Sequence, residues 1–349
     1  MTISLPSEAS SAPAQDDLWC PTPLASLELA EIPSELHFVR DHFAAPESDP
    51  ASWSLELTCG HRSLALDLDD LRSLERRALR VVLECAGHRR AEFEPIRKGI
   101  PWGAGAVAEA RWAGTSLARV LELVGIPAGV REVVLEGADA GAVDGFDGVH
   151  RFARSLPIAK ALDPDVLLAY EMNREPIPAR RGGPVRAIVP GWYPTDSVKW
   201  LDRVWFTDEE FDGVFQSHDY RLREPGEQGA GRRMTEVPVH ALITTPADGA
   251  VGLPGGEVSV RGVAWGGTRG VAAVFVRVDG GQWEAARLRP ARGTYARVPW
   301  ERRCTLGPGA HEVECRAIDG AGRSQPDRPP LNVRGYGNNA IHRIGLRLA

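Results

Sequence analysis

The chain has 349 residues, with 41 Lys and Arg against 47 Asp and Glu, so its net charge of −6 gives no global reason to expect nucleic-acid binding. No apolar run is long enough to span a membrane, and residues 1–20 lack the basic and apolar regions of a signal peptide, so we expect a cytoplasmic protein. The five cysteines are dispersed and form no disulfide framework, CxxC pair or CxxCH haem motif. This length accommodates one large or two ordinary domains.

The first elements alternate between strand-like and helix-like patterns. Residues 1–30 are rich in Pro, Ser and Ala, and we expect them to be extended or partly disordered. Residues 35–43 mix apolar residues with two histidines and an arginine, which indicates a strand carrying surface charges. Residues 53–57 alternate like a half-buried strand. Residues 67–79 place acids before arginines and space leucines by three, which predicts a helix.

A cysteine follows the apolar strand Val81–Leu83, in the sequence Cys-Ala-Gly-His-Arg-Arg at residues 85–90. Gly87 permits a sharp turn at the end of the strand. The positive charge nearby favours the thiolate of Cys85, which is the form that binds a metal or attacks an electrophile. A buried, inert cysteine beside a surface basic cluster explains these residues equally well.

The next hundred residues contain a glycine-rich connection, two helical patterns and several strands. Thr115 reads as the N-cap of a helix that carries apolar residues at positions 117, 120, 121 and 124 and ends at Gly125. A second short helix is predicted over residues 155–162. Strands are predicted at residues 132–137, 166–170 and 186–191. The irregular alternation favours an α+β fold over a regular βαβ winding.

The pattern changes after the Gly- and Pro-rich residues 223–231, which we interpret as a linker. Beyond it, valines alternate with polar residues, and Asp279-Gly280-Gly281 and Asp319-Gly320 mark turns. Such short strands predict a β-sandwich of immunoglobulin type over residues 236–349, with a structural or associative role.

Five stretches, in this order along the chain, resemble signatures of the sulfite oxidase family of molybdenum enzymes. They are Phe38-Val-Arg-Asp-His42, the Cys85 loop, Ala110-Arg-Trp-Ala-Gly114, Leu168-Ala-Tyr-Glu-Met-Asn173 and Ser197-Val-Lys-Trp-Leu201. The resemblance implies a mixed α/β molybdopterin-binding catalytic domain over residues 31–225. It also implies that residues 236–349 form an immunoglobulin-like dimerisation domain, and therefore that the protein is a homodimer.

The resemblance further implies that Cys85 is the only protein ligand of the molybdenum, whose other sulfur ligands come from a pterin dithiolene. A thiolate suits a metal already bound by sulfur. The implied cofactor contacts are Phe38, Val39, Arg40, His42, Cys85, Asp139, Arg186, Ser197, Val198 and Lys199. The chain departs from the family at two positions: His88 stands where Asn is usual, and Arg181 where His is usual. No cofactor contact is therefore carried over to position 181.

The substrate residues implied by the resemblance are Arg40, Arg90, Trp102, Tyr220 and Arg334, of which Arg90 and Tyr220 join Cys85 as catalytic residues. Several converging cations are what a small dianion needs when it loses its water, and guanidinium groups match oxyanions geometrically. Taken singly, these residues also read as surface arginines, a core tryptophan and a loop tyrosine.

The function implied is oxidation of sulfite to sulfate by two-electron oxygen-atom transfer. Two alternatives remain: a family member acting on another oxyanion or oxide, as nitrate reductases do, and a binding module that has lost its cofactor. Because the sequence has no haem or flavin signature, we expect no haem in the protein and an external electron acceptor, for which a cytochrome is one candidate. Nucleic acid and membranes are not expected partners.

Overall fold

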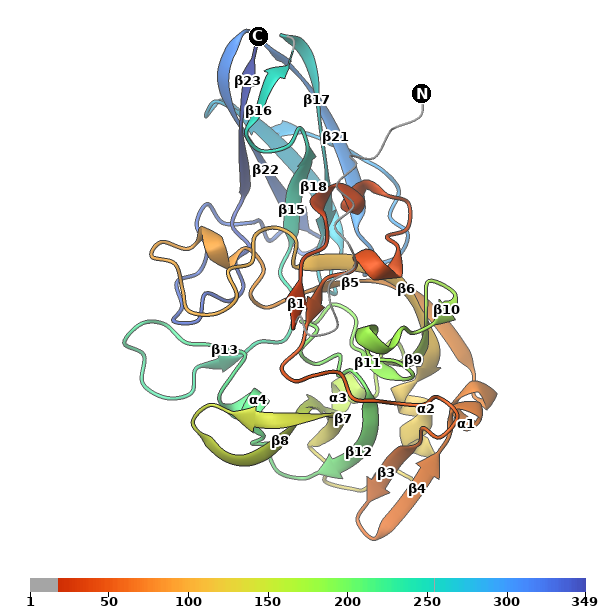
Figure 1. The fold of residues 1–349 in the computed structure, drawn as a ribbon. Coiled ribbons are helices and arrows are strands. Elements are labelled where there is room, and N and C mark those ends of the chain that lie inside the picture. Colours follow the sequence, from red (N-terminus) through yellow and green to blue (C-terminus); the bar gives the residue numbers. More distant parts are fainter. Residues whose placement is uncertain (1–17, 254) are drawn as a thin grey trace.

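The computed structural model describes residues 18–253 and 255–349, which form two domains (Figure 1). The larger domain contains every α-helix of the described residues and the strands up to β14. The strands from β15 to β23 form an elongated second domain that carries the C-terminus at its far end (Figure 1). None of the helices in these ranges is long and apolar enough to cross a membrane.

The helices are short, and strands account for far more of the described residues than helices do. The α-helices are α1 (Leu68–Ser73), α2 (Leu117–Glu122), α3 (Ile158–Ala161) and α4 (Val214–Ser217), and the 3₁₀ helices are η1 (Leu24–Glu28), η2 (Ser34–Leu36), η3 (Arg90–Glu92) and η4 (Ala179–Arg181). The strands of the larger domain are β1 (Trp19–Cys20), β2 (Val39–Arg40), β3 (Leu55–Cys59), β4 (Arg62–Leu66), β5 (Arg76–Glu84), β6 (Val107–Ser116), β7 (Glu132–Val143), β8 (Phe146–Pro157), β9 (Leu167–Met172), β10 (Glu175–Pro176), β11 (Arg186–Ile188), β12 (Leu201–Thr207), β13 (Arg221–Leu222) and β14 (Arg232–Arg233). Those of the second domain are β15 (His240–Thr245), β16 (Ala250–Leu253), β17 (Gly256–Trp265), β18 (Val271–Val278), β19 (Glu284–Ala285), β20 (Arg287–Leu288), β21 (Val298–Leu306), β22 (Gly309–Asp319) and β23 (His342–Leu348).

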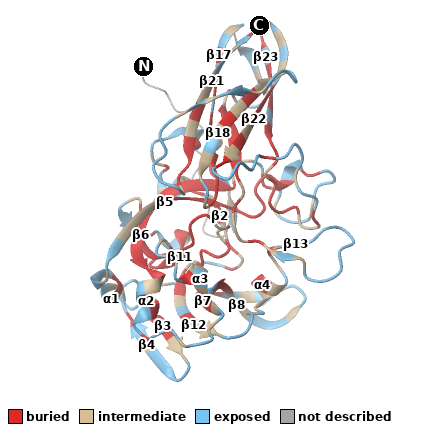
Figure 2. Ribbon diagram, turned by 180° about the vertical axis from the view of Figure 1, so that it is seen from behind, coloured by how far each residue is buried: buried red, intermediate tan, exposed pale blue. Residues whose placement is uncertain are grey.

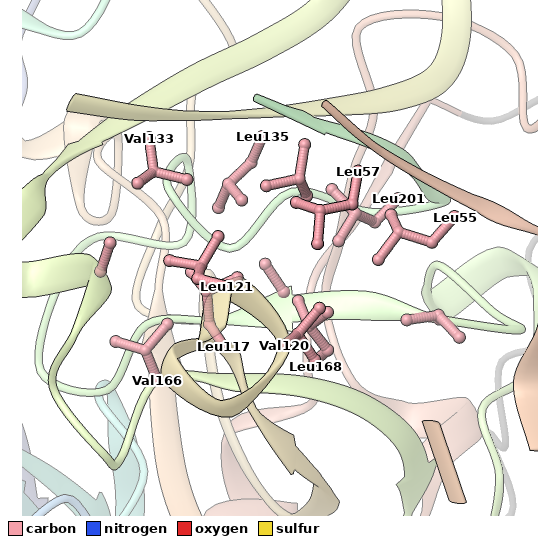
Figure 3. Packing of buried hydrophobic residues seen from close by; sticks show 14 of the residues in the cluster. Leu55, Leu57, Leu117, Val120, Leu121, Val133, Leu135, Val166, Leu168 and Leu201 are labelled. Carbon is pink, nitrogen blue, oxygen red and sulfur yellow. The ribbon is translucent and has the colours of Figure 1, made fainter. Parts of the chain in front are cut away.

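Two five-stranded sheets enclose the main core of the larger domain. One has the strand order β4-β3-β12-β7-β8, and the other has β10-β9-β6-β5, with β11 also paired to β9. Figure 3 shows Leu117, Val120 and Leu121 of α2 between side chains of both sheets, and all three are fully buried. The helix predicted from the spacing of these residues is therefore an element of the core.

The helix predicted over residues 67–79 is correct only in its first half. Asp67 and Asp70 form a capping box that starts α1. The helix ends at Ser73, and residues 76–84 are strand β5, which pairs along its whole length with β6. Arg76 and Arg77 extend from the strand to Glu171 and Asp165, at 2.5 and 2.8 Å. Pairing with distant acids thus overrode the local charge pattern that favoured a longer helix.

Other predicted boundaries also shift because strands continue further than their local sequence indicates. Thr115, predicted as an N-cap, lies in β6, and Ser155, predicted to start a helix, lies in β8. The Ser155 hydroxyl donates to Glu132 across the sheet at 2.8 Å. The strand predicted over residues 35–43 is reduced to β2, preceded by η2.

The second domain is the predicted β-sandwich. Its sheets have the orders β15-β17-β21-β20 and β16-β23-β22-β18-β19. The alternating Val258 and Val260, Val274 and Val276, and Val313 all enter the core between the sheets, which Figure 2 shows as buried strand surface. The α+β fold with a C-terminal sandwich is therefore confirmed.

The described part of the N-terminal segment contacts the second domain, and the predicted linker differs from expectation. Residues 18–30 contain the short strand β1 and the 3₁₀ helix η1, and Glu28 accepts a hydrogen bond from Thr244 of the second domain at 2.7 Å. Residues 1–17 lie outside the described residues. Residues 223–231, predicted as a linker, are the exposed loop between the paired strands β13 and β14.

Candidate active site

A cavity opens in the larger domain where segments distant in the sequence meet. The residues around it come from β2 and the chain on both sides of it, the end of β5, strands β6, β7, β8, β9 and β11, helix η4, and the loops near residues 195 and 220. It is lined by His37, Phe38, Arg40, Asp41, His42, Leu83, Cys85, Ala86, Trp112, Asp139, Phe152, Met172, Arg180, Arg181, Arg186, Pro194, Thr195, Ser197, Lys199 and Tyr220.

Most of the residues expected to contact the cofactor line this cavity. They are Phe38, Arg40, His42, Cys85, Asp139, Arg186, Ser197 and Lys199. Two others do not: Val39 and Val198 point into hydrophobic cores and are almost fully buried. Their positions beside lining residues reflect the alternation of an extended chain, in which neighbours point to opposite sides.

Cys85 lies at the cavity wall, directly after strand β5. Burial raises the pKa of its thiol, although the Gly87 N–H, Arg40 and Arg90 act in the opposite direction. The prediction that neighbouring charge keeps this cysteine as a thiolate is therefore wrong for the protein without a bound cation. A metal at the sulfur would remove the proton, because a coordinated thiol is deprotonated outright.

The three basic residues after Cys85 turn away from it. Burial lowers the pKa of His88 well below its ordinary value, and the ring packs 5.8 Å from that of His240 in the second domain. Arg89, in a left-handed conformation at φ 56°, donates to the Ala340 carbonyl at 2.6 Å. The turn predicted at Gly87 is present, because the His88 N–H donates to the Cys85 carbonyl at 2.8 Å across Ala86 and Gly87. A second turn follows, in which the Arg90 N–H donates to the Gly87 carbonyl at 3.0 Å.

Gly87 has a second role, because it leaves space for the Arg90 guanidinium. A Cβ at Gly87 would lie 2.7 Å from Nη2 of Arg90, and one at Gly99 would lie 2.7 Å from Nη1. Arg90 donates from Nε to the Arg334 carbonyl and from Nη1 to the Ile100 carbonyl, both at 3.0 Å. Arg90 is thus held behind the Cys85 loop and does not line the cavity.

Trp102 and Arg334 also lie outside the cavity lining. Trp102 is almost fully buried, packs in one cluster with Cys85, and meets Trp19 edge to face at 5.1 Å. The Arg334 guanidinium lies 2.9 Å from the carboxylate of Asp219, and its side chain is 39% exposed. Arg334 therefore sits next to the loop of Tyr220 and makes an ion pair there.

His42 and Tyr220 form a buried polar pair inside the cavity. The Tyr220 hydroxyl lies 2.6 Å from Nε2 of His42, and Arg40 Nη2 lies 3.4 Å from Nδ1 of the same ring. Burial, with Arg40 and Arg154, lowers the pKa of His42 well below its ordinary value, while burial raises the pKa of Tyr220. At neutral pH the imidazole is therefore uncharged and the phenol keeps its proton.

Cationic side chains also line the cavity. Arg186 donates to the carbonyls of Arg181 and Ser197 at 2.7 and 2.9 Å, and burial lowers its pKa to about 9. Lys199 forms an ion pair with Asp41. Burial raises the pKa of Asp139 to about 7, so this acid is only partly charged at neutral pH. The lining therefore has an excess of positive charge.

Several buried polar atoms of the lining have no hydrogen-bond partner among the described residues. They are Nε2 of His37, Nε1 of Trp112, Oδ1 of Asp139, Nη1 of Arg181 and Oγ1 of Thr195. Native proteins seldom leave such atoms unpaired, because each costs free energy. Donors and acceptors that converge on a cationic cavity beside one thiol fit a large polar ligand with an anionic group, as the molybdopterin cofactor is.

His37, Asp41, Arg181 and Thr195 were not expected in the site. The first two flank residues that were, so the quoted segment around Arg40 contained the signal. Arg181 stands where the chain departs from the family, so the resemblance gives no cofactor contact at this position. Nothing in the local sequence around Thr195 marks it, since only the fold places this loop against the cavity.

Comparison with known proteins agrees with this site. Residues 42–215 match the family described as oxidoreductase molybdopterin binding domain, and residues 232–349 match the Mo-co oxidoreductase dimerisation domain. The human protein "Sulfite oxidase, mitochondrial" is 37% identical over 93% of this chain and 63% of its own length, so the chain spans less than two thirds of that relative. Sulfite oxidase of Arabidopsis thaliana is 34% identical over 90% of this chain and 88% of its own length.

The fold itself matches the crystal structure of the sulfane dehydrogenase SoxCD from Paracoccus pantotrophus, with a TM-score of 0.82, 24% identity, and coverage of 96% of this chain and 85% of that one. The two domain matches, the relatives and the cavity around Cys85 agree with one another, and the chain belongs to the sulfite oxidase family of molybdopterin oxidoreductases.

Proposed function

We propose that this protein binds a molybdenum–molybdopterin cofactor and oxidises sulfite to sulfate. The observation that carries the proposal is the position of Cys85, the one thiol in the lining of a cationic cavity that also holds several buried polar atoms without partners among the described residues. The reaction turns sulfite and water into sulfate, two protons and two electrons. When bound, the cofactor supplies the oxygen-atom transfer, while the protein binds, orients and tunes it.

The cofactor would be held by three kinds of group. The Cys85 sulfur is the soft ligand that a metal with sulfur donors accepts. Arg186, Lys199 and Arg40 supply charge and donors, and Asp139 supplies an unpaired acceptor atom. A carboxyl group with a pKa near 7 can either accept or donate a hydrogen bond at neutral pH, which suits a pterin ring that presents both.

The oxyanion would bind on the Arg40 and Tyr220 side. Tyr220 keeps its proton, so its hydroxyl can donate to an anionic oxygen, and His42 fixes the orientation of that hydroxyl. Arg90 adds positive charge from behind the Cys85 loop, and Trp102 supports that loop by packing against the cysteine. Arg334 reaches the same side only after its ion pair with Asp219 breaks, so anion binding competes with that pair.

The two alternatives lead to different measurements. Metal and pterin analysis of the purified protein distinguishes an enzyme from a binding module, since a module without cofactor contains neither. Turnover assays with sulfite and ferricyanide, and with nitrate and a reductant, distinguish the two enzymes. We expect molybdenum and pterin in equal amounts, sulfite-dependent ferricyanide reduction and no haem absorption. If the cofactor-loaded protein does not oxidise sulfite but reduces nitrate, the proposed substrate is wrong.

The remaining parts of the proposal concern assembly and electron transfer. A homodimer formed through residues 236–349 follows from the match to the dimerisation family. The electrons would pass to an external acceptor, of which a cytochrome is one candidate. A stoichiometric haem in the purified protein would contradict this route.

A further inference from the structure

The connection between β22 and β23 returns to the larger domain and places Tyr336 beside two residues proposed to act on the oxyanion. The Tyr336 ring stacks on the Tyr220 ring, with the ring centroids 5.6 Å apart and the planes 21° from parallel. The guanidinium carbon of Arg90 lies 5.0 Å from the centroid of the Tyr336 ring. Tyr336 is only 7% exposed. One buried aromatic ring from the second domain therefore contacts both residues.

The segment that carries Tyr336 is fixed to the loop of the proposed metal ligand. Asn332 donates to the Tyr336 carbonyl at 2.8 Å and accepts from the Tyr336 N–H at 2.9 Å. The Gly337 N–H donates to the carbonyl of Ala86 at 2.8 Å, and Ala86 directly follows Cys85. The position of the ring is thus set by the contacts that join the second domain to the Cys85 loop.

Tyr220 depends on its surroundings for its orientation. Its backbone is left-handed at φ 56°, a conformation that is uncommon for residues other than glycine and persists only where neighbours support it. Its hydroxyl lies 2.6 Å from Nε2 of His42, and the guanidinium carbon of Arg154 lies 5.7 Å from its ring centroid. His42 holds the hydroxyl end, whereas the stack with Tyr336 holds the plane of the ring. Loss of the stack would therefore let the hydroxyl turn.

The contact between Arg90 and Tyr336 joins a cation to the face of an uncharged ring. Burial and the nearby carboxylate of Asp219 raise the pKa of Tyr336 to about 12, so the phenol keeps its proton at neutral pH. The Arg90 guanidinium donates to the carbonyls of Arg334 and Ile100. The negative face of the ring adds attraction that grows when both groups are shielded from water. The ring therefore helps to hold Arg90 as well as Tyr220.

We propose that Tyr336 is a positioning residue for oxyanion binding: its ring holds the Tyr220 hydroxyl and the Arg90 guanidinium in a fixed relation, so that a donor and a cation act on one anion. The inference rests on the proposed function, because the anion is the sulfite named there. Tyr336 lies outside the cavity lining, so its effect passes through its two neighbours. The ring is the part that acts, and the hydroxyl is dispensable. The second domain thereby contributes to the site as well as to assembly.

The test uses cofactor-loaded protein and separates the ring from the hydroxyl. Tyr336→Phe keeps the ring, and Tyr336→Leu removes it while leaving a large apolar side chain. Tyr295→Leu is the matched control, because Tyr295 also joins the second domain to the larger one, through a hydrogen bond from its hydroxyl to Asp165 at 3.1 Å. For each protein we would measure kcat and KM with sulfite and ferricyanide, the Kd of sulfate by calorimetry, and the urea midpoint.

We expect Tyr336→Leu to raise the KM for sulfite and the Kd of sulfate by about tenfold, a factor equivalent to about 1.4 kcal/mol. The kcat should change much less, because the lost interaction acts on the bound anion before and during the reaction. Tyr336→Phe and Tyr295→Leu should retain the original values. Tyr336→Phe keeps the packing, so a raised KM in that variant would overturn the inference even if the leucine variant proved too unstable to measure.

A double-mutant cycle identifies the route of the effect. In a Tyr220→Phe background the hydroxyl that Tyr336 orients is absent, so Tyr336→Leu should raise the Kd of sulfate by a smaller factor there. Equal factors in the two backgrounds would show that Tyr336 does not act through Tyr220. If the original protein oxidises sulfite and Tyr336→Leu matches it in KM and in sulfate affinity, the inference is overturned while the proposed function stands. If the loaded original protein neither binds sulfate nor oxidises sulfite, both fail.

Discussion

The substitution Gly87→Ala tests how tightly the Cys85 loop is packed around Arg90. The added methyl group would lie 2.7 to 2.8 Å from Nη2, Cζ and Nη1 of the guanidinium, which is closer than real Cβ contacts allow. An exposed arginine would simply move. Arg90 is buried, its guanidinium also lies close to Gly99, and two carbonyls accept its hydrogen bonds, so a shift of the guanidinium weakens or breaks those hydrogen bonds.

The cost can be bounded from the contacts that must change. Moving the guanidinium sacrifices up to two charge-assisted hydrogen bonds, to the carbonyls of Arg334 and Ile100, at about 1.5–3 kcal/mol each. Because the loop relaxes in part, we expect Gly87→Ala to destabilise the protein by about 2–4 kcal/mol. The apparent KM for sulfite should also rise, since Arg90 would leave its position behind Cys85.

Urea unfolding of both proteins measures the destabilisation, and a double-mutant cycle identifies its source. In an Arg90→Met background the methyl group meets no guanidinium, so Gly87→Ala should cost much less there. The interaction energy of the cycle should therefore exceed the about 0.5 kcal/mol within which independent sites are additive. A full cost in that background, or no cost in the original protein, would show that Gly87 does not make room for Arg90.

Four further predictions concern the site, the assembly and the pH dependence. Cys85→Ser should keep the fold and much of the bound pterin but lose nearly all turnover. Serine at each of the other cysteines (Cys20, Cys59, Cys304 and Cys315) should reduce stability at most. Near-normal turnover of Cys85→Ser would exclude Cys85 as the ligand. Arg334→Gln should raise the KM for sulfite about tenfold and weaken sulfate inhibition, because it removes one charge-assisted contact of roughly 1.5–3 kcal/mol, and unchanged values would place it outside the site. Light scattering at micromolar concentration should show a dimer, and a monomer would contradict assembly through residues 236–349. Burial lowers the pKa of His37 and His342 to about 3, so below about pH 6.5 these rings bind protons in the unfolded chain but not in the folded protein. The urea midpoint should therefore fall as the pH falls below about 6.5. Constant midpoints between pH 7 and 5 would contradict the burial of neutral rings.

The local sequence was sufficient for features that depend on short-range periodicity. Alternating valines predicted the strands of the sandwich, and the spacing of Leu117, Val120 and Leu121 predicted helix α2, because one buried face imposes a fixed repeat. The local sequence was insufficient where contacts with distant residues decide the secondary structure. The local pattern predicts that Arg76 lies near the end of a helix. It lies in β5 instead, because β5 pairs with β6 and the Arg76 side chain forms an ion pair with Glu171.

The candidate active site likewise has features that the local sequence predicts and features that only the tertiary structure decides. The motif around Cys85 predicts the metal ligand, and the resemblance located part of the cavity lining, because those residues belong to short segments that can be recognised in the sequence. Only the tertiary structure decided three other features: the protonation state of Cys85, the ion pair of Arg334 with Asp219, and the hydrogen bond from Arg181 to the Ser34 carbonyl. Desolvation and pairing depend on what surrounds a group in space, and for these three residues the surroundings come from remote parts of the chain.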